Sequence, residues 1–292
     1  MYFYTSNKPN SLPFLHFYNM EKPTIAYDIA FSANNTNTGE GWCCGTPAGI
    51  STTQWPRGRS NGEPMAHIWT LLVPEQYRTK GSDYVAISLF HADDHVSDTI
   101  EDVAALFDSG TFKEPTTAIP FWKALLDYAQ NKHPQEQYFE DLIGGGWALI
   151  WLTEAEFRSA STAVPDPAIG IYPGYETIDG TNAYKQNSPA KYITLVERIN
   201  DPNVGKNITE FPDEEEENAY VPLFTAKAAA LDLDDRFFGK SHFGGTSSPS
   251  QGEPDFSPFY FEFDEVYGNA NLGGDGVAQI DLLHDKFDWS CG

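Results

Sequence analysis

The chain has 292 residues, 14% of them aromatic, and a net charge of −24 that comes from 42 acidic and 18 basic residues. This length and aromatic content allow a full hydrophobic core, which excludes a mainly disordered protein. Phosphate backbones and anionic lipids repel so acidic a chain, so we expect no nucleic-acid and no membrane partner. A basic protein partner is favoured by long-range attraction, although excess acid also serves solubility alone.

Cysteine usage and the N-terminus point to the cytoplasm. The three cysteines are Cys43, Cys44 and Cys291, and an odd number that includes an adjacent pair argues against a disulfide framework. The first 20 residues lack a basic segment followed by an apolar one, so we expect no secretory signal. No apolar run approaches the roughly 18 residues that a membrane-spanning helix needs.

The first third of the chain predicts strands separated by turn-rich loops. Residues 24–31 form one expected strand, and a loop rich in glycine and proline follows over residues 45–58. Residues 66–73 and 84–91 are dense in aliphatic and aromatic side chains, which is typical of strands.

A helical block is expected next. Asp98 and Glu101 have the spacing of a capping box, and an apolar stripe with helical period follows them. Pro120 occupies a first-turn position ahead of a second apolar stripe. A third helix is predicted over residues 135–143, ended by the three glycines at 144–146.

The rest of the chain predicts more strands and two helices. Thr153 and Glu156 predict the cap of a short helix, and residues 223–233 predict another. Strands and helices come in blocks rather than in strict alternation, which favours an α+β fold. The strands are predicted at residues 147–152, 191–199, 258–263 and 277–283.

A motif recurs along the chain at a fixed offset. Gly62-Glu63-Pro64 and Gly252-Glu253-Pro254 lie 190 residues apart, and each precedes an apolar strand. The first strand is followed by Glu75 and Tyr77, and the second by Glu265 and Tyr267, again 190 residues apart. Such a repeat predicts an internal duplication, in which two units that cannot bury both faces alone share one core. We expect one domain over residues 1–292, with repeat units at about 45–96 and 243–292 and a helical insertion at about 97–145.

Several short motifs resemble the YwqG-like family of bacterial proteins. They are Trp55-Pro56-Arg57, Gly62-Glu63-Pro64-Met65, Phe243-Gly244-Gly245, Gly273-Gly274-Asp275-Gly276-Val277, Gln279-Ile280-Asp281 and Phe287-Asp288-Trp289-Ser290-Cys291. The family is a domain of unknown function whose members are often associated with toxin–immunity gene clusters. The resemblance therefore implies a cytoplasmic binding protein and no particular chemistry.

An acidic run is the first candidate site. Asp213 to Glu217 carries five like charges between aromatic residues, a pattern suited to a basic groove, although a solvated loop explains it too. We hypothesise an immunity-type protein that inhibits a basic bacterial toxin by covering it, with aromatic anchors supplying the apolar contact. The predicted partner-binding residues are Phe211, Asp213, Glu214, Glu215, Glu216, Glu217, Tyr220 and Trp151.

A histidine-rich segment offers an alternative from another class of function. His91, Asp93, Asp94 and His95 carry side chains that hold metal ions, and would suit a metal-dependent hydrolase. The segment lies at a predicted strand end, where residues four apart span about 13 Å. Only a tight turn would bring the side chains together, and a solvated turn is the other interpretation.

Recognisable catalytic motifs are missing from the sequence. It contains no Gly-x-Ser-x-Gly motif, no P-loop and no dinucleotide fingerprint, and we expect no cofactor. Cys43 and Cys44 are interpreted as small buried side chains rather than nucleophiles. The abundance of tyrosine and tryptophan also suits a binder of a small or carbohydrate ligand, without indicating a position.

Overall fold

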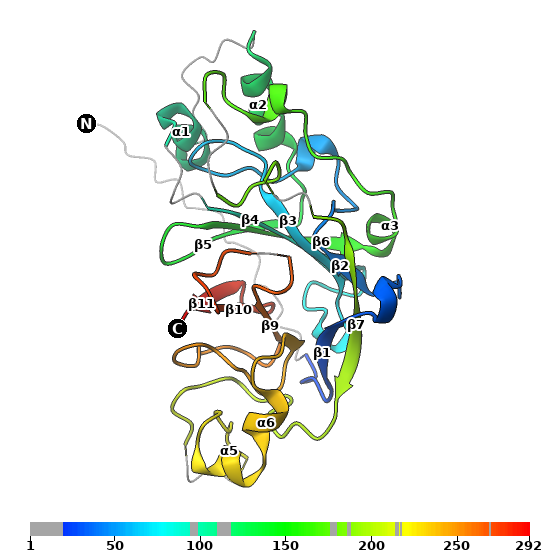
Figure 1. The fold of residues 1–292 in the computed structure, drawn as a ribbon, viewed down its shortest axis with the longest axis vertical. Coiled ribbons are helices and arrows are strands. Elements are labelled where there is room, and N and C mark those ends of the chain that lie inside the picture. Colours follow the sequence, from blue (N-terminus) through cyan, green and yellow to red (C-terminus); the bar gives the residue numbers. More distant parts are fainter. Residues whose placement is uncertain are drawn as a thin grey trace, which may run out of the picture.

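The computed structural model describes residues 20–93, 99–109, 118–175, 180–185, 188–213, 216, 218–268 and 270–292. Within these ranges the chain forms one 11-stranded sheet of antiparallel strands with a few short helices (Figure 1). None of the helices in these ranges is long and apolar enough to cross a membrane.

The elements have the following bounds. The strands are β1 (Ala26–Phe31), β2 (Gly41–Cys43), β3 (Ala66–Leu72), β4 (Tyr84–Ala92), β5 (Glu136–Glu140), β6 (Gly146–Thr153), β7 (Lys191–Arg198), β8 (His242–Phe243), β9 (Tyr260–Asp264), β10 (Val277–Asp281) and β11 (Lys286–Ser290). The α-helices are α1 (Glu101–Ser109), α2 (Pro120–Asn131), α3 (Glu154–Phe157), α4 (Pro167–Gly170), α5 (Ala226–Ala230) and α6 (Leu233–Phe237). Single 3₁₀ turns are η1 (Ala33–Asn35), η2 (Thr52–Gln54) and η3 (Glu75–Tyr77).

The strand order is mirrored about the β1–β7 pair, except that β5 has no counterpart on the other side. It reads β11-β10-β9-β8-β1-β7-β2-β3-β4-β6-β5, so β1 and β7 lie side by side in the middle. On one side β1 pairs with β8, and on the other β7 pairs with β2. Each central strand therefore pairs with a strand from the opposite half of the chain, which joins the two halves into one sheet.

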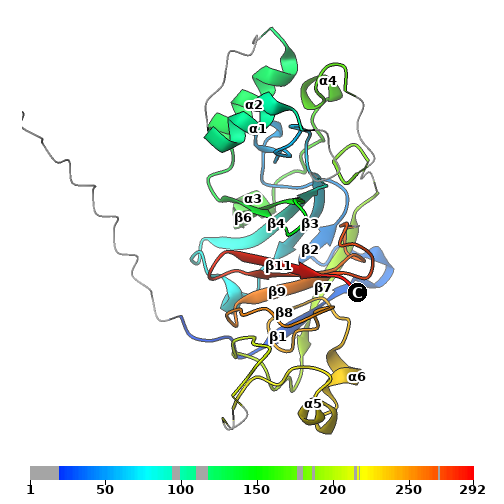
Figure 2. The ribbon, with the colours of Figure 1, turned by 90° about the vertical axis from the view of Figure 1, so that its left-hand side faces the viewer.

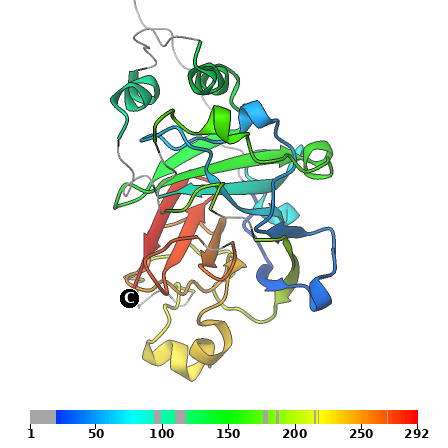
Figure 3. The same cartoon turned by 45° about the horizontal axis from the view of Figure 1, so that its top comes forward.

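The strands of the two halves lie against each other (Figure 3), and their facing side chains form one hydrophobic core. The indole of Trp69 on β3 lies 5.3 Å, between ring centroids, from both Phe261 and Phe263 on β9. Phe139 on the edge strand β5 stacks on Phe287 of the other edge strand, β11, at 6.0 Å. The two edges of the sheet thus approach each other, and the sheet nearly closes on itself.

The helices lie mainly at the two ends of the molecule. Figure 1 shows α1 and α2 at one end of the longest axis and α5 and α6 at the other, and Figure 2 shows the same separation from the side. The first pair packs its apolar faces together around Phe121 and Leu125. The second pair packs around Leu233 and Phe237.

Most predicted strands are confirmed. The strands expected near residues 24–31, 66–73, 84–91, 147–152, 191–199, 258–263 and 277–283 correspond to β1, β3, β4, β6, β7, β9 and β10. Pro120 opens α2, and Thr153 forms the predicted capping box with Glu156. Asp98, the expected cap of α1, lies outside the described residues. The sequence analysis did not predict β2, β8 and β11, of which β2 and β8 have only three and two residues.

Two helix predictions are wrong. Residues 135–143 contain β5, which pairs with β6 along the edge of the sheet, so sheet pairing overrides the local helical pattern. Residues 223–233 contain not one helix but α5 and the start of α6. The break falls at Asp232, whose left-handed backbone (φ 59°) interrupts the helix.

The shared core makes a prediction about stability. Phe263 is fully buried, so Phe263→Ala should lower the free energy of unfolding by about 3–5 kcal/mol in urea denaturation. Leu142→Ala is the control, because the Leu142 side chain is 85% exposed and should change stability by less than about 0.5 kcal/mol. Equal effects of the two substitutions would contradict a core shared by both halves.

Candidate functional site

The acidic run lies at the surface as far as it is described. Phe211 is 83% exposed, and Asp213 and Glu216 are exposed as well. Glu214, Glu215 and Glu217 lie outside the described residues. Because its ring is exposed, Phe211 is available for contact with a partner.

Two predicted anchors are instead part of the interior, which corrects their assignment. Trp151 is 0% exposed because its position in β6 directs the indole into the shared core. Tyr220 is 4% exposed and packs with Ile208 and Phe256. Its hydroxyl accepts a hydrogen bond from the Ser247 backbone N–H at 2.9 Å. Aromatic composition alone does not distinguish a core side chain from a surface anchor, and neither residue presents a surface here.

The described part of the histidine cluster is a buried structural pair. His91 Nε2 lies 3.1 Å from Asp93 Oδ1, and His91 Nδ1 lies 3.1 Å from the Gly146 carbonyl oxygen. Asp93 also accepts hydrogen bonds from the Thr181 backbone N–H and the Asn271 amide. The His91 side chain holds the pKa of Asp93 below its usual range against the opposing effect of burial.

Asp94 and His95 lie outside the described residues. Among the described residues, no group of three or more His, Cys, Asp or Glu side chains could hold a metal ion. Cys43 and Cys44 are buried, as expected of small core side chains.

A second buried polar network surrounds Glu262 on β9. Its carboxylate accepts hydrogen bonds from Ser247 Oγ at 2.6 Å and from the Gln279 amide at 3.1 Å, and it lies 3.2 Å from His242 Nε2. Ser247 and His242 thus both contact the glutamate, whereas a catalytic triad would place the histidine between the other two. All four side chains are buried, so this network ties strands and loops together and offers no access to a substrate.

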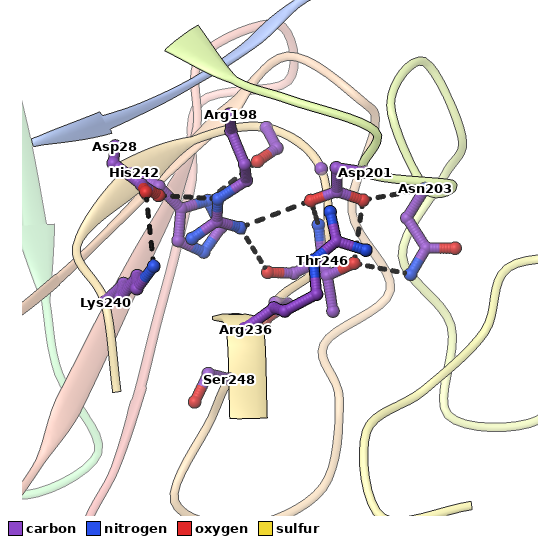
Figure 4. Close-up of polar contacts among 12 residues, drawn as sticks. Asp28, Arg198, Asp201, Asn203, Arg236, Lys240, His242, Thr246 and Ser248 are labelled. Carbon is purple, nitrogen blue, oxygen red and sulfur yellow. Dashed lines mark hydrogen bonds and ion pairs between the residues drawn. The ribbon is translucent and has the colours of Figure 1, made fainter. Parts of the chain in front are cut away.

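A third network is centred on Arg198 at the end of β7 (Figure 4). The Arg198 side chain is fully buried. Its guanidinium donates hydrogen bonds to Asp28 Oδ1 at 2.6 Å and to the Thr246 carbonyl oxygen at 2.8 Å. It lies 3.4 Å from Asp201, and 4.8 Å above the ring centroid of Phe237 on α6. The network therefore fixes α6 against the central strands.

Fixing α6 positions an exposed aromatic pair at its end. Phe238 follows α6 directly and is 56% exposed, and its ring meets the 70% exposed ring of Phe224 edge to face at 5.2 Å. The two rings line a groove of about 770 Å³ that extends to Val266, which is 59% exposed. We call this site the Phe224–Phe238 groove. The sequence analysis did not predict this groove. The adjacent pair Phe237-Phe238 was an available signal, because neighbouring residues at a helix end cannot both face the core.

The groove combines apolar and acidic walls. Asp264, Glu265 and Asp275 contribute carboxyl groups beside the aromatic rings. Burial raises the pKa of Asp264. A groove lined by both apolar and acidic side chains suits a segment that carries both apolar and basic side chains.

No protein-family model, no curated protein and no solved structure matches the chain. The resemblance to the YwqG-like family stays a prediction from short motifs.

The buried carboxyl of Glu253 makes a prediction about pH. Burial, with Glu262 nearby, raises the pKa of Glu253 from 4.5 to about 8. Between these values the folded chain keeps a proton that the unfolded chain has lost, so this group contributes stability at low pH that is lost as pH rises. Glu253→Gln should therefore gain stability relative to the parent by about 1.4 kcal/mol per pH unit over this window.

Urea denaturation from pH 5 to pH 8 measures this difference. Glu101→Gln, at an exposed position of α1, is the matched control and should follow the parent at every pH. A constant difference between Glu253→Gln and the parent would show that Glu253 ionises normally in the folded chain.

Proposed function

We propose that this chain is an acidic binding protein that holds a basic protein partner in the Phe224–Phe238 groove. The observation that carries the proposal is the placement of Phe224. Its backbone has φ 60°, a left-handed conformation that bulky residues rarely adopt, and its ring is exposed.

This placement costs folding free energy and gains little inside the chain. The left-handed backbone costs about 1–2 kcal/mol for a residue other than glycine. A hydrogen bond from the Phe224 backbone N–H to Asp234 Oδ1, 2.7 Å long, holds the conformation. The ring contacts Phe238 but stays mostly in water. Strained backbone and exposed aromatic rings are typical of binding sites, where contact with a partner offsets the cost.

The negative charge of the chain supports a basic partner. The net charge of −24 attracts a basic protein over long range and speeds encounter. Asp264, Glu265 and Asp275 continue that charge to the groove itself. The two phenylalanines supply the apolar burial on which affinity depends, since exposed ion pairs contribute little.

The finer proposal is an immunity-type role. The YwqG-like motifs suggest a cytoplasmic protein that neutralises a bacterial toxin by covering it, and an acidic groove would suit a basic toxin such as a nuclease. The hydrolase alternative gains no support from the described residues, because His91 and Asp93 are engaged with each other inside the protein.

We also propose that the two halves of the chain descend from one duplicated unit. The mirrored strand order supports this, and so does the turn that follows β2 and β8. Residues 44 and 45, and residues 244 and 245, have consecutive positive φ values. The backbone N–H of Cys44 donates to the Ile68 carbonyl at 2.9 Å, and that of Gly244 donates to the Tyr260 carbonyl at the same distance.

Substitutions in the groove test the proposed function. The tagged chain captures its partner from lysate of its own host, and the variants Phe238→Ser and Phe224→Gly are compared with it. We expect one near-stoichiometric basic protein that is lost from both variants, with an affinity at least about 30-fold lower, the loss typical of an anchor residue. High salt should weaken the capture as well.

The controls separate binding from folding. Leu142→Ser changes an exposed apolar residue far from the groove and should retain the partner. Phe224→Gly should leave stability within about 1 kcal/mol of the parent, because glycine accepts positive φ without strain. A partner that all the variants retain, or no partner for the parent chain, would overturn the proposal.

A further inference from the structure

A cavity of about 410 Å³ lies at the opposite end of the molecule from the Phe224–Phe238 groove, among α1, α2, β5 and the loop before β3. Its apolar lining includes Leu106 and Leu126 from the two helices. The polar lining includes Arg57, Arg59, Tyr128, Lys132, Glu136 and Tyr138. Three of the 18 basic residues of a strongly acidic chain thus gather around one small space.

Arg57 is the unusual member of this group. It is 2% exposed, and its Nη1 donates to the carbonyl oxygens of Gly62 at 3.2 Å and Ile169 at 3.4 Å. Its Nε has no hydrogen-bond partner, and no carboxylate of the described residues lies within ion-pair distance of it. Burial lowers the pKa of Arg57 to about 10, so the guanidinium stays charged at neutral pH.

A buried cation without a counter-ion is costly. Removing a charge from water costs several kcal/mol unless an opposite charge and hydrogen bonds compensate. Arg198 shows the usual solution in the same chain, since Asp28 and Asp201 both lie within ion-pair distance of it. Among the described residues, Arg57 has two neutral carbonyls as partners instead and no carboxylate within ion-pair distance.

The neighbouring groups do not supply that charge. Glu136 is the acidic residue of the lining, and its Oε1 accepts a hydrogen bond from the Tyr128 hydroxyl at 2.6 Å. Burial raises the pKa of Glu136, which favours its neutral form. The guanidinium of Arg59 lies 3.6 Å from the ring centroid of Tyr138, and Lys132 adds a further positive charge. Among the described residues that line the cavity, Glu136 is acidic, and Arg57, Arg59 and Lys132 are basic.

We propose that this cavity binds a small organic anion, whose carboxylate or phosphate group pairs with Arg57 and whose apolar part lies against Leu106 and Leu126. A guanidinium is the side chain best suited to such anions, because its N–H groups match two oxygens at once. The volume falls within the range of small-molecule sites, and apolar walls with a few polar groups are typical of them. This site is separate from the proposed protein partner and lies at the other end of the sheet.

Defined probes test the proposal by isothermal titration calorimetry on the full chain. The probes are phenyl phosphate and benzoate, with inorganic phosphate and the cation benzylamine as comparators. We expect saturable binding of at least one organic anion, weaker binding of inorganic phosphate, and none of benzylamine. Saturable binding of neither organic anion, or equal binding of inorganic phosphate, would overturn the assignment.

Variants locate the binding. Arg57→Met should lower the affinity for the organic anion at least tenfold. Arg158 is half exposed and paired with Glu154, so Arg158→Met should leave this affinity unchanged. Without ligand, Arg57→Met should melt at the same temperature as the parent or higher, because it removes an uncompensated buried charge. Unchanged anion binding in Arg57→Met would identify Arg57 as a structural residue and overturn the assignment.

A further variant keeps the test decisive if Arg57→Met fails to fold. Lys132 is exposed and follows α2, so Lys132→Met should leave the fold intact. The substitution removes one of the three basic side chains of the lining and should lower the affinity for the organic anion several-fold. Full affinity in Lys132→Met, together with failure of Arg57→Met to fold, would contradict the proposal.

Discussion

The packing of Trp69 and Trp147 against Phe263 is the constraint on which the rest of the structure depends. Each half of the chain offers a strand face that is too apolar to stand in water, and the two faces bury each other. The exchange of central strands, β1 with β8 and β7 with β2, makes this burial a property of the whole sheet. This largest core cluster needs side chains from both halves.

This arrangement leaves the two ends of the molecule available for specialisation. Helices α1 and α2 close one end and enclose a cationic cavity around Arg57. Helices α5 and α6 extend the other end and present an acidic, aromatic groove around Phe224 and Phe238. Buried charges behave differently in the two regions. Arg198 pairs with two carboxylates and holds α6 in place, so we assign it a structural role. Arg57 pairs with no carboxylate of the described residues, so we assign it a ligand.

Strand composition and helix capping were readable from the sequence because they depend on local chemistry. The dense aliphatic strands, Pro120 and the Thr153 capping box were predicted for that reason. Features that depend on tertiary contacts could not be predicted from the sequence. Residues 135–143 form an edge strand because β6 pairs with them. Trp151 is buried although an aromatic residue also suits a surface anchor, and the lack of a carboxylate partner for Arg57 among the described residues depends on how the surrounding loops pack. Local sequence does not record which side chains end up opposite each other.

The interlocked sheet is the central claim, and dividing the chain tests it most directly. A break between Gln186 and Asn187 separates the strands β1 to β6 from β7 to β11. Co-expressed fragments should copurify in a 1:1 complex with a cooperative urea transition, while each fragment alone should show none, because its core face and a central strand lack their partners. Cooperative unfolding of either fragment by itself would contradict the account.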